Sequence, residues 1–189
     1  EILARDHAKR ISDQANVAMI VVESATGAVR AHIGSAGYYE TLRQGSVDMT
    51  EATRSPGSTL KPFLYAMAFD EDLAAPNTII LDAPTRFGAY APNNFNAGFA
   101  GEISLSAALQ HSLNVPSVKL LDAIGPERFA AKLRNSGLHL FFSPGGRPNL
   151  TMILGGVGVT LEDLASGYLQ LSSYQGPRDL HFVTPVSTP

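Results

Sequence analysis

Cysteine is absent from this sequence of 189 residues, and its absence removes several kinds of chemistry at once. Without cysteine the chain can form no disulfide, no thiolate metal site and no cysteine nucleophile. No two of its five histidines stand three or four positions apart, which is the spacing of a local zinc motif. We therefore expect no bound metal and no cofactor.

A concentration of basic residues is also missing. The chain has 14 Lys and Arg against 17 Asp and Glu, a formal net charge of -3, and no basic cluster. Binding to nucleic acid phosphates requires concentrated Lys and Arg, so we expect no nucleic acid partner. No apolar run approaches the ~18 residues that span a bilayer, and no signal-peptide pattern opens these residues.

The chain does have enough apolar sequence for a core. Hydrophobic residues make up 44% of it. A chain of this length and composition predicts one globular domain rather than a peptide module.

The stretch that carries the most chemistry is 54–63, with the sequence RSPGSTLKPF. Its proline and first glycine interrupt regular structure, and apolar residues then recur at helical spacing up to Asp70. Ser58 is therefore expected near the N-terminus of a helix. Lys61 follows three positions later on the same helix face, where its amine can reach the serine hydroxyl.

Such a pair can act as a nucleophile and its base. A serine hydroxyl is a poor nucleophile unless a neighbouring base takes its proton, and Lys61 can be that base when it is neutral. Burial or a second cation lowers a lysine pKa, and the positive end of a helix dipole at Ser58 favours the alkoxide. The spacing alone equally fits a serine N-cap followed by an exposed lysine in the first helical turn.

The hydrophobic pattern around this stretch predicts a mixed fold. A short amphipathic helix over 1–14 precedes two strands, at 17–22 and 28–34, which a turn containing glycine joins into a hairpin. The loop over 35–53 is long enough to suggest a functional role. A further short strand is expected at 78–81.

Helices dominate the later part of the chain. Ser104 is expected to cap one helix, and Pro116 and Pro126 mark the first turns of two more. The second of these is expected to end near Gly137. Thr160 is expected to cap the final helix.

Several isolated side chains have an ordinary structural interpretation. Asp82 and Glu102 are expected to be solvated loop carboxylates. His111 is expected in packing or at the surface, because an S-x-x-K site already has its base. The aromatic residues at 38–39 and within 87–99 fit a substrate groove and ordinary packing equally well.

Three segments together resemble class A penicillin-binding proteins. The 54–63 stretch resembles the family's active-site segment R-x-P-G-S-[ST]-x-K-P-F. The sequence YAPNNF at 90–95 resembles its Y-x-P-x-N-F region, and SLNVP at 112–116 resembles its S-x-N motif. The resemblance covers most of residues 17–174 and is strongest to the penicillin-binding protein 1C branch.

This resemblance implies a peptidoglycan DD-transpeptidase that works through a serine acyl-enzyme and is covalently inhibited by β-lactams. By motif position, Ser58 would attack the D-Ala-D-Ala terminus of a stem peptide, and Lys61 would accept its proton. Ser112 would relay a proton to the leaving amine, and Asn114 would hydrogen-bond the substrate backbone. The implied fold is α/β (α+β) and β-lactamase-like, with an N-terminal β-hairpin and a mostly helical remainder.

The family's third motif, K-[ST]-G, is absent from these residues, and the resemblance places it on the opposite wall of the cleft. Other residues follow each of the lysines, which are Lys9, Lys61, Lys119 and Lys132. We therefore expect a C-terminally truncated domain that lacks later sheet strands and is impaired in acylation. Residues 1–15 would be a linker with a short helix, 16–176 a partial transpeptidase domain and 177–189 an extended tail. The hairpin would keep an unpaired edge, through which a homodimer could form.

Two other functions stay open. A β-lactamase-like serine hydrolase shares the S-x-x-K and S-x-N logic, and continued turnover of a β-lactam would identify it. A non-catalytic module would bind peptidoglycan or partner enzymes, with Ser58 only a cap. The resemblance implies stem peptides and β-lactams as partners, along with other cell-wall enzymes, and a parent protein anchored in the inner membrane that faces the bacterial periplasm.

Overall fold

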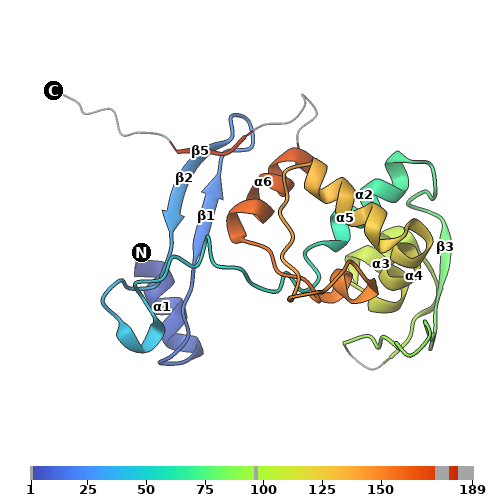
Figure 1. Ribbon diagram of the computed structural model, residues 1–189, viewed down its shortest axis with the longest axis horizontal. Helices are drawn as coiled ribbons and strands as arrows, with labels where there is room; N and C mark the ends of the chain where they lie inside the picture. The colour runs from blue at the N-terminus through green and yellow to red at the C-terminus, as the bar shows by residue number, and fades with distance from the viewer. Residues whose placement is uncertain (1, 96–97, 173–178, 183–189) are drawn as a thin grey trace. The chain divides into compact units, whose positions relative to one another are not determined.

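The computed structural model describes residues 2–95, 98–172 and 179–182. The chain divides into two compact units, which are described separately (Figure 1). The first unit comprises Glu1–Arg54, Ser136–His139 and Val159–Pro189, and the second comprises Ser55–Asn135 and Leu140–Gly158. Each unit is thus built from stretches that are separated in the sequence.

Among its described residues, the first unit combines a small sheet with two α-helices. Its regular elements are α1 (Ile2–Ile11), β1 (Met19–Val22), β2 (Ala28–Ile33), the 3-10 helix η1 (Thr41–Arg43), α6 (Leu161–Ser172) and β5 (His181–Phe182). The predicted hairpin is confirmed: β1 pairs antiparallel with β2, starting with Met19 opposite Ile33, and the register shifts after Val21. The turn between the strands uses Gly27 at a φ of +81°, a left-handed conformation that suits glycine.

Strand β5 pairs in parallel with β2, which gives the sheet order β1-β2-β5. This pairing covers β2 at Ala28 and Val29, and β1 remains an outer strand of the sheet. A strand of two residues carries too little alternation to be predicted from its own sequence. Of the expected tail, 177–178 and 183–189 lie outside the described residues.

Helix α6 begins where the sequence predicts. The Thr160 hydroxyl accepts a hydrogen bond from the Asp163 backbone N–H at 3.0 Å, which is the expected N-cap contact. The helix contacts β1 and thereby covers part of the sheet. Its capped start and its packing both belong to the first unit.

The second unit holds most of the helices. Its elements are α2 (Lys61–Asp70), β3 (Ile79–Asp82), β4 (Gly101–Ser104), α3 (Leu105–Gln110), α4 (Asn114–Ile124), α5 (Pro126–Asn135) and the 3-10 helix η2 (Leu150–Leu154). Helix α4 contacts α2, α3, α5, β3 and η2. It is apolar on most sides and buries Val115, Val118 and Leu121 completely. The core of this unit is therefore built around α4.

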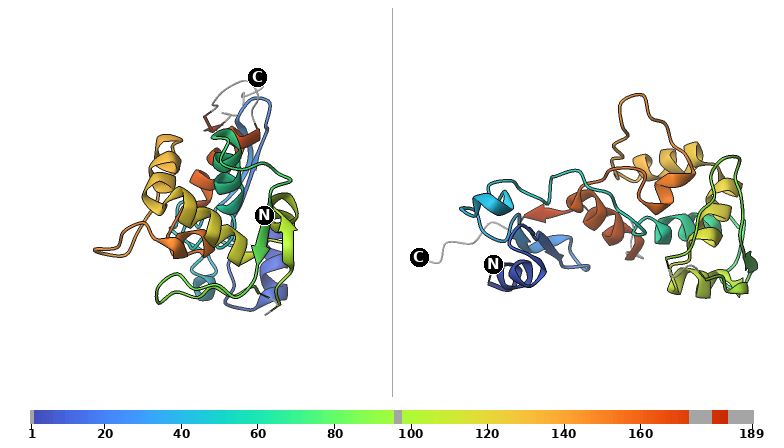
Figure 2. Two further views of the ribbon diagram at one scale, coloured as in Figure 1. Left: turned by 90° about the vertical axis from the view of Figure 1, so that its right-hand side faces the viewer. Right: turned by 90° about the horizontal axis from the view of Figure 1, so that it is seen from below.

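The sequence pattern predicts β3 but not β4. The two strands pair antiparallel and lie side by side, with Ile79 opposite Ser104 and Asp82 opposite Gly101 (Figure 2). The sequence of β4 is GEIS, which has one strong strand former among its residues. Pairing with β3, rather than its own propensity, makes this segment a strand.

Helix starts in the second unit follow the predicted signals. Ser104 Oγ accepts a hydrogen bond at 3.2 Å from the backbone N–H three residues later and so caps α3. Helix α4 begins at Asn114, which puts Pro116 in the first turn, where its missing N–H costs no helical hydrogen bond. Helix α5 begins at Pro126 and ends just before Gly137, whose φ is +81°.

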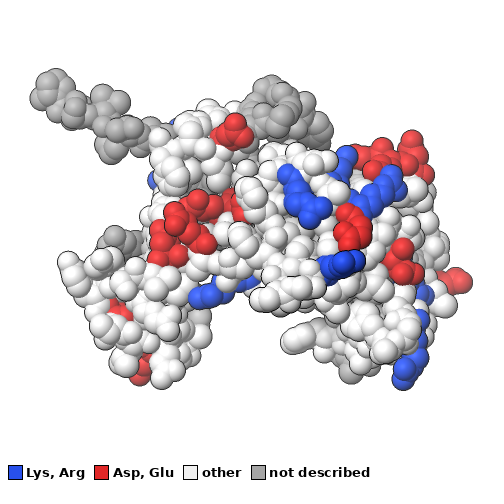
Figure 3. Space-filling model, in the orientation of Figure 1, with Lys and Arg blue, Asp and Glu red and all other residues white. Residues whose placement is uncertain are grey.

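Charged side chains of both signs occur on the face that Figure 3 draws. Figure 3 shows Lys and Arg next to Asp and Glu on the face drawn. One such pair in the second unit joins Arg128 and Glu71 at 2.8 Å. Among the described helices, none is both long and apolar enough to cross a membrane.

Candidate active site

Ser58 lies in the turn that leads into α2, which confirms the predicted loop-to-helix junction. Backbone hydrogen bonds from Thr59 N to Pro56 O (3.0 Å) and from Lys61 N to Ser58 O (3.1 Å) close this turn. Helix α2 itself begins only at Lys61. The expectation that the serine and the lysine share a helix face is therefore wrong in detail, because a turn hydrogen bond relates them instead.

Lys61 is the buried cation of the site and is only 1% exposed. Its Nζ donates to Ser112 O at 2.6 Å and to Ser112 Oγ at 3.3 Å. It also donates to Asn114 Oδ1 at 2.8 Å. The fold thus brings together three of the predicted site residues, and it excludes the interpretation of Lys61 as an exposed first-turn lysine.

Burial also changes the proton affinity of this lysine. Removal from water disfavours the ammonium form and lowers the pKa of Lys61 from 10.5 to about 8. The atoms that accept hydrogen bonds from Nζ are a carbonyl, a hydroxyl and an amide oxygen, all neutral. At pH 7 roughly one tenth of the molecules then carry a neutral Lys61.

Ser112 occupies the connection between α3 and α4 in a strained backbone conformation. Its φ is +51°, in the left-handed region that non-glycine residues rarely adopt. Backbone hydrogen bonds from Ser112 N to Leu109 O and from Leu113 N to Ala108 O, both 2.9 Å, hold this turn. The turn brings both the carbonyl and the hydroxyl of Ser112 to Lys61, and strain of this kind clusters at functional sites.

Asn114 is held through both its side chain and its backbone. Its Nδ2 donates to Asn93 O at 2.7 Å, which leaves Oδ1 for Lys61. Its backbone N–H donates to Asn94 Oδ1 at 2.8 Å. Asn93 and Asn94 thus orient both the side-chain amide and the backbone N–H of Asn114.

Three of the four predicted site residues line a cavity of about 520 Å³ in the second unit. The residues around it are Ser58, Phe95, His111, Ser112, Asn114 and Leu154. Phe95 is 99% exposed, which places a free aromatic ring at the cavity. His111 is exposed, as expected, but it also lines the cavity, and no local sequence signal marks Leu154.

Ser58 is exposed on this cavity, and its hydroxyl has no hydrogen-bond partner among the described residues. Lys61, Ser112 and Asn114 form one hydrogen-bonded cluster. The arrangement supplies an exposed serine hydroxyl on the cavity and, three positions along the chain, a buried amine with a lowered pKa. Within the described part of the chain, no group of three or more His, Asp or Glu could hold a metal ion.

Asp82 corrects one expectation, because it is completely buried and not a solvated loop carboxylate. It ends β3, and its Oδ2 accepts hydrogen bonds from Ala100 N at 2.7 Å and Asn94 Nδ2 at 2.9 Å. The sequence does not reveal this burial because it depends on the unpredicted pairing of β3 with β4. Glu102, on β4, is exposed as expected.

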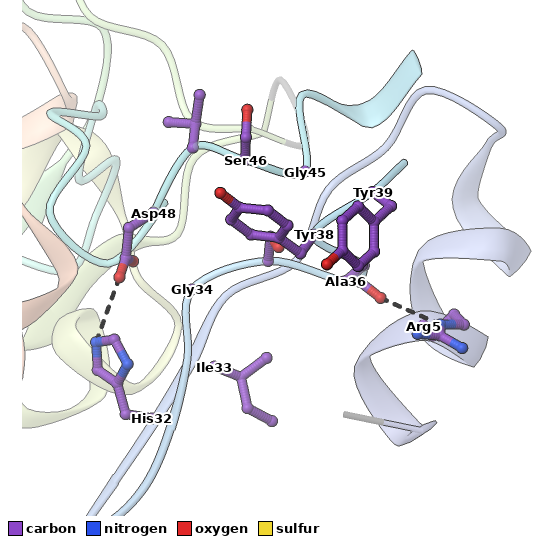
Figure 4. Close-up of a pocket in the computed structure, with 13 residues that line it drawn as sticks. Arg5, His32, Ile33, Gly34, Ala36, Tyr38, Tyr39, Gly45, Ser46 and Asp48 are labelled. Atoms are coloured by element: carbon purple, nitrogen blue, oxygen red, sulfur yellow. Dashed lines mark hydrogen bonds and ion pairs between the residues drawn. The ribbon is translucent and has the colours of Figure 1, made fainter. Parts of the chain in front are cut away.

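A second cavity, of about 470 Å³, lies in the first unit beside β2 and the loop that follows it (Figure 4). Tyr38 and Tyr39 line it, with ring centroids 5.2 Å apart in an edge-to-face arrangement. Arg5 Nε donates to Ala36 O at 3.4 Å on the same wall. The tyrosine pair thus lines a cavity other than the one that contains Ser58.

Comparison with known proteins places the chain in a family. The family described as "Penicillin binding protein transpeptidase domain" matches residues 17–140, a span that includes the Ser58 and Ser112 segments. The chain belongs to the penicillin-binding protein transpeptidase family. Penicillin-binding protein 1C of Escherichia coli (strain K12) is 49% identical over 168 residues, which are 89% of this chain and 22% of that protein. Penicillin-binding protein 1A of Neisseria flavescens is 34% identical over 159 residues, 80% of this chain and 19% of that protein.

Solved penicillin-binding proteins share this fold. The PonA1 protein from Mycobacterium tuberculosis in complex with penicillin V matches with a TM-score of 0.74 at 22% identity, over 93% of this chain and 50% of that chain. Penicillin-binding protein 1A from Haemophilus influenzae matches with a TM-score of 0.72 at 23% identity, over 82% and 23% of the two chains. The expected mixed α/β fold of a penicillin-binding protein transpeptidase is therefore confirmed. The chain spans only 22% and 19% of the two curated relatives named above.

Proposed function

We propose that this chain carries the acylation site of a peptidoglycan DD-transpeptidase. The observation that carries the proposal is the buried Lys61, whose Nζ contacts both Ser112 and Asn114. A lysine with a pKa of about 8 can act as a general base near neutral pH. Membership of the transpeptidase family supports the same reaction class.

In the first step, Ser58 Oγ attacks the carbonyl of the D-Ala-D-Ala bond at the end of a stem peptide. Neutral Lys61 accepts the Ser58 proton as the bond between Oγ and the carbonyl carbon forms. The backbone N–H of Ser58 donates to the developing oxyanion, and one such donor is typically worth ~3 kcal/mol. Asn114 hydrogen-bonds the substrate backbone through its side chain.

In the second step, the bond between the carbonyl carbon and the nitrogen of the terminal D-Ala breaks. The proton on Lys61 passes to Ser112 Oγ, 3.3 Å from Nζ, as that hydroxyl gives its own proton to the leaving amine. An acyl-enzyme on Ser58 remains. An amine of a neighbouring stem peptide then attacks it, and the same groups act in reverse to form the crosslink and restore Ser58.

A β-lactam reacts with Ser58 in the same way, and its ring amide bond opens. The leaving nitrogen stays tethered to the acyl group, so it cannot diffuse away, and the acyl-enzyme persists. The proposed ligands are therefore stem peptides and β-lactams.

The proposal extends to the protein that contains these residues. Residues 16–176 form part of the transpeptidase domain, preceded by a linker at 1–15 and followed by a tail at 177–189. The parent protein is anchored in the inner membrane and faces the periplasm. Other cell-wall enzymes and a second copy of the chain, paired through the hairpin edge, are further proposed partners.

Intact-mass spectrometry of the natural full-length chain after exposure to penicillin tests the proposal. We expect one penicillin adduct per chain, its complete loss in Ser58→Ala, and its retention in Ser46→Ala, a matched serine change in the first unit. An adduct that survives Ser58→Ala would refute the assigned nucleophile. Continued hydrolysis of penicillin by a short-lived adduct would identify a β-lactamase-like hydrolase instead.

A further inference from the structure

Helix α4 begins without an N-cap side chain of its own. The first N–H groups of a helix need acceptors from outside it, and a Ser, Thr, Asp or Asn at the N-cap usually supplies one. The N-cap residue of α4 is Leu113, which has no acceptor in its side chain. The acceptor is Asn94 Oδ1, which lies 2.8 Å from Asn114 N and 3.5 Å from Val115 N.

The buried carboxylate of Asp82 determines how Asn94 is oriented. Asn94 Nδ2 donates to Asp82 at 2.9 and 3.1 Å and to Gly98 O at 2.9 Å. A carboxylate only accepts hydrogen bonds, so it selects the NH2 end of the Asn94 amide. The oxygen end is then directed at α4. Both side chains are inside the protein, with residue exposures of 0% for Asp82 and 7% for Asn94.

This chain of hydrogen bonds ends at Lys61. Asn94 holds the backbone of Asn114, whose Oδ1 is one acceptor of Lys61 Nζ. Two residues before Asn114 lies Ser112, with its strained φ of +51° and two further oxygens that contact Nζ. A strained turn keeps its shape only when the surrounding contacts hold it.

We propose that Asp82 and Asn94 are positioning residues for the reaction at Ser58. Asp82 orients the Asn94 amide, and Asn94 fixes the start of α4, so that the oxygens of Ser112 and Asn114 meet the Lys61 amine. Neither residue lies on the cavity, and both act through Asn114. The consequence for acylation rests on the proposed function, whereas the hydrogen bonds can be tested without it.

Exchanging the carboxylate of Asp82 and the amide of Asn94 between the two positions tests the proposal. Asn94→Asp keeps the side-chain shape and the oxygen that accepts from α4, but it places two carboxyl groups against each other. Ionising both of them at this distance is strongly unfavourable. Asp82→Asn alone replaces one of the two carboxylate oxygens that face Asn94 Nδ2 with an NH2 group, which cannot accept a hydrogen bond. In the double variant Asp82→Asn/Asn94→Asp, an amide again donates to a carboxylate, with the roles reversed.

Acylation of the natural full-length chain by a fluorescent penicillin is measured. The quantities are the limiting acylation rate, the dissociation constant of the non-covalent penicillin complex and the final adduct yield. We expect Asn94→Asp to lower the limiting rate by about 10- to 100-fold, as for misplaced groups near a reacting centre. The limiting rate of the double variant should be at least about tenfold higher than that of Asn94→Asp. The dissociation constant and the adduct yield should stay within about twofold of those of the unchanged chain.

Glu102→Gln is the matched control, because Glu102 is an exposed carboxylate on the strand that pairs with the strand of Asp82. It should acylate at the unchanged rate. A full acylation rate in Asn94→Asp would overturn the proposal. A lower adduct yield in Asn94→Asp, with the remaining active molecules reacting at the full rate, would also overturn it, because partial unfolding gives that result.

Hydrogen–deuterium exchange of the peptide at 112–116 provides a test that does not depend on activity. Asn94→Ala removes the acceptor of the Asn114 N–H, so exchange in this peptide should accelerate by about tenfold or more, and Glu102→Gln should leave it unchanged. Unchanged exchange in Asn94→Ala would overturn the proposal. If the chain without substitutions forms no penicillin adduct, the proposed function fails. The exchange result then decides by itself whether Asn94 holds the start of α4.

Discussion

Lys61 combines burial with an absence of any charged partner among its described contacts. Buried cations are usually paired with carboxylates. The hydrogen bonds of Lys61 Nζ go instead to a carbonyl, a hydroxyl and an amide oxygen. Desolvation is therefore not offset by an opposite charge, and the pKa falls to about 8. A base needs such a pKa to accept a proton near neutral pH and still return it.

The pH dependence of acylation follows from this pKa. Only the neutral amine accepts the Ser58 proton, so the acylation rate should rise about tenfold per pH unit below pH 8 and level off above it. Stopped-flow acylation by a fluorescent penicillin between about pH 6 and about pH 9.5 measures this limb.

Lys61→Arg is the control for this profile. A guanidinium keeps the positive charge but does not lose its proton in proteins, so this variant should lose at least about 100-fold in acylation rate at every pH. A flat profile in the unchanged chain, or an active Lys61→Arg variant, would show that Lys61 is not the base.

At the scale of elements, the turn after η2 packs against the turn that carries Ser58. Ser55 Oγ donates to Gly155 O at 2.9 Å. Gly155 has a φ of +102°, and a Cβ at this position would collide with Ser55 Oγ and lie 3.1 Å from the backbone of Gly57. The Ser55 hydroxyl can rotate away only by losing its hydrogen bond to Gly155 O, and the contact with Gly57 is with backbone, which side-chain rotation cannot relieve.

Substitution of Gly155 should therefore harm both stability and acylation. Gly145 is a matched control, because its φ of +74° is also left-handed but nothing lies within 4 Å of its Cβ position. Gly155→Ala should lower the free energy of unfolding by about 1–3 kcal/mol more than Gly145→Ala does. It should also slow acylation at Ser58. Urea unfolding and acylation rates of both variants measure this, and equal effects would contradict the close packing of the two turns.

At the scale of the whole molecule, the site is assembled from segments far apart in the sequence. Lys61 and Ser112 are 51 positions apart and meet because α2 packs against both α3 and α4, whose connection contains Ser112. The present residues match 22% of the length of penicillin-binding protein 1C of Escherichia coli. They contain no K-[ST]-G triplet.

The missing triplet leads to a prediction for the 189-residue chain itself. The family resemblance places K-[ST]-G on the opposite wall of the cleft, where it would contribute donors to the oxyanion and the substrate carboxylate. We expect the 189-residue chain to be acylated at least about 100-fold more slowly than the natural full-length chain, the usual cost of a lost oxyanion donor. Parallel acylation time courses of the two proteins measure this difference. Equal rates would show that the present residues suffice for acylation.

Local features of the fold could be predicted because local sequence determines them. The caps at Ser104 and Thr160 are hydrogen bonds to a backbone N–H three residues away. The 17–34 hairpin follows from two apolar runs joined by a turn with Gly27. The β4 strand and the two-residue β5 escaped prediction because distant partners, not their own residues, make them strands.

The sequence by itself determined the nucleophile candidate Ser58 and its motif partners, because their types and spacings recur in one family. Only the tertiary structure decided that Lys61 is buried and that Asp82 is buried as well. Only it decided that Asn94 serves as the cap of α4. Burial and long-range hydrogen bonds arise when distant segments pack together, so no local pattern encodes them. The same packing removes Lys61 from water and so lowers its pKa.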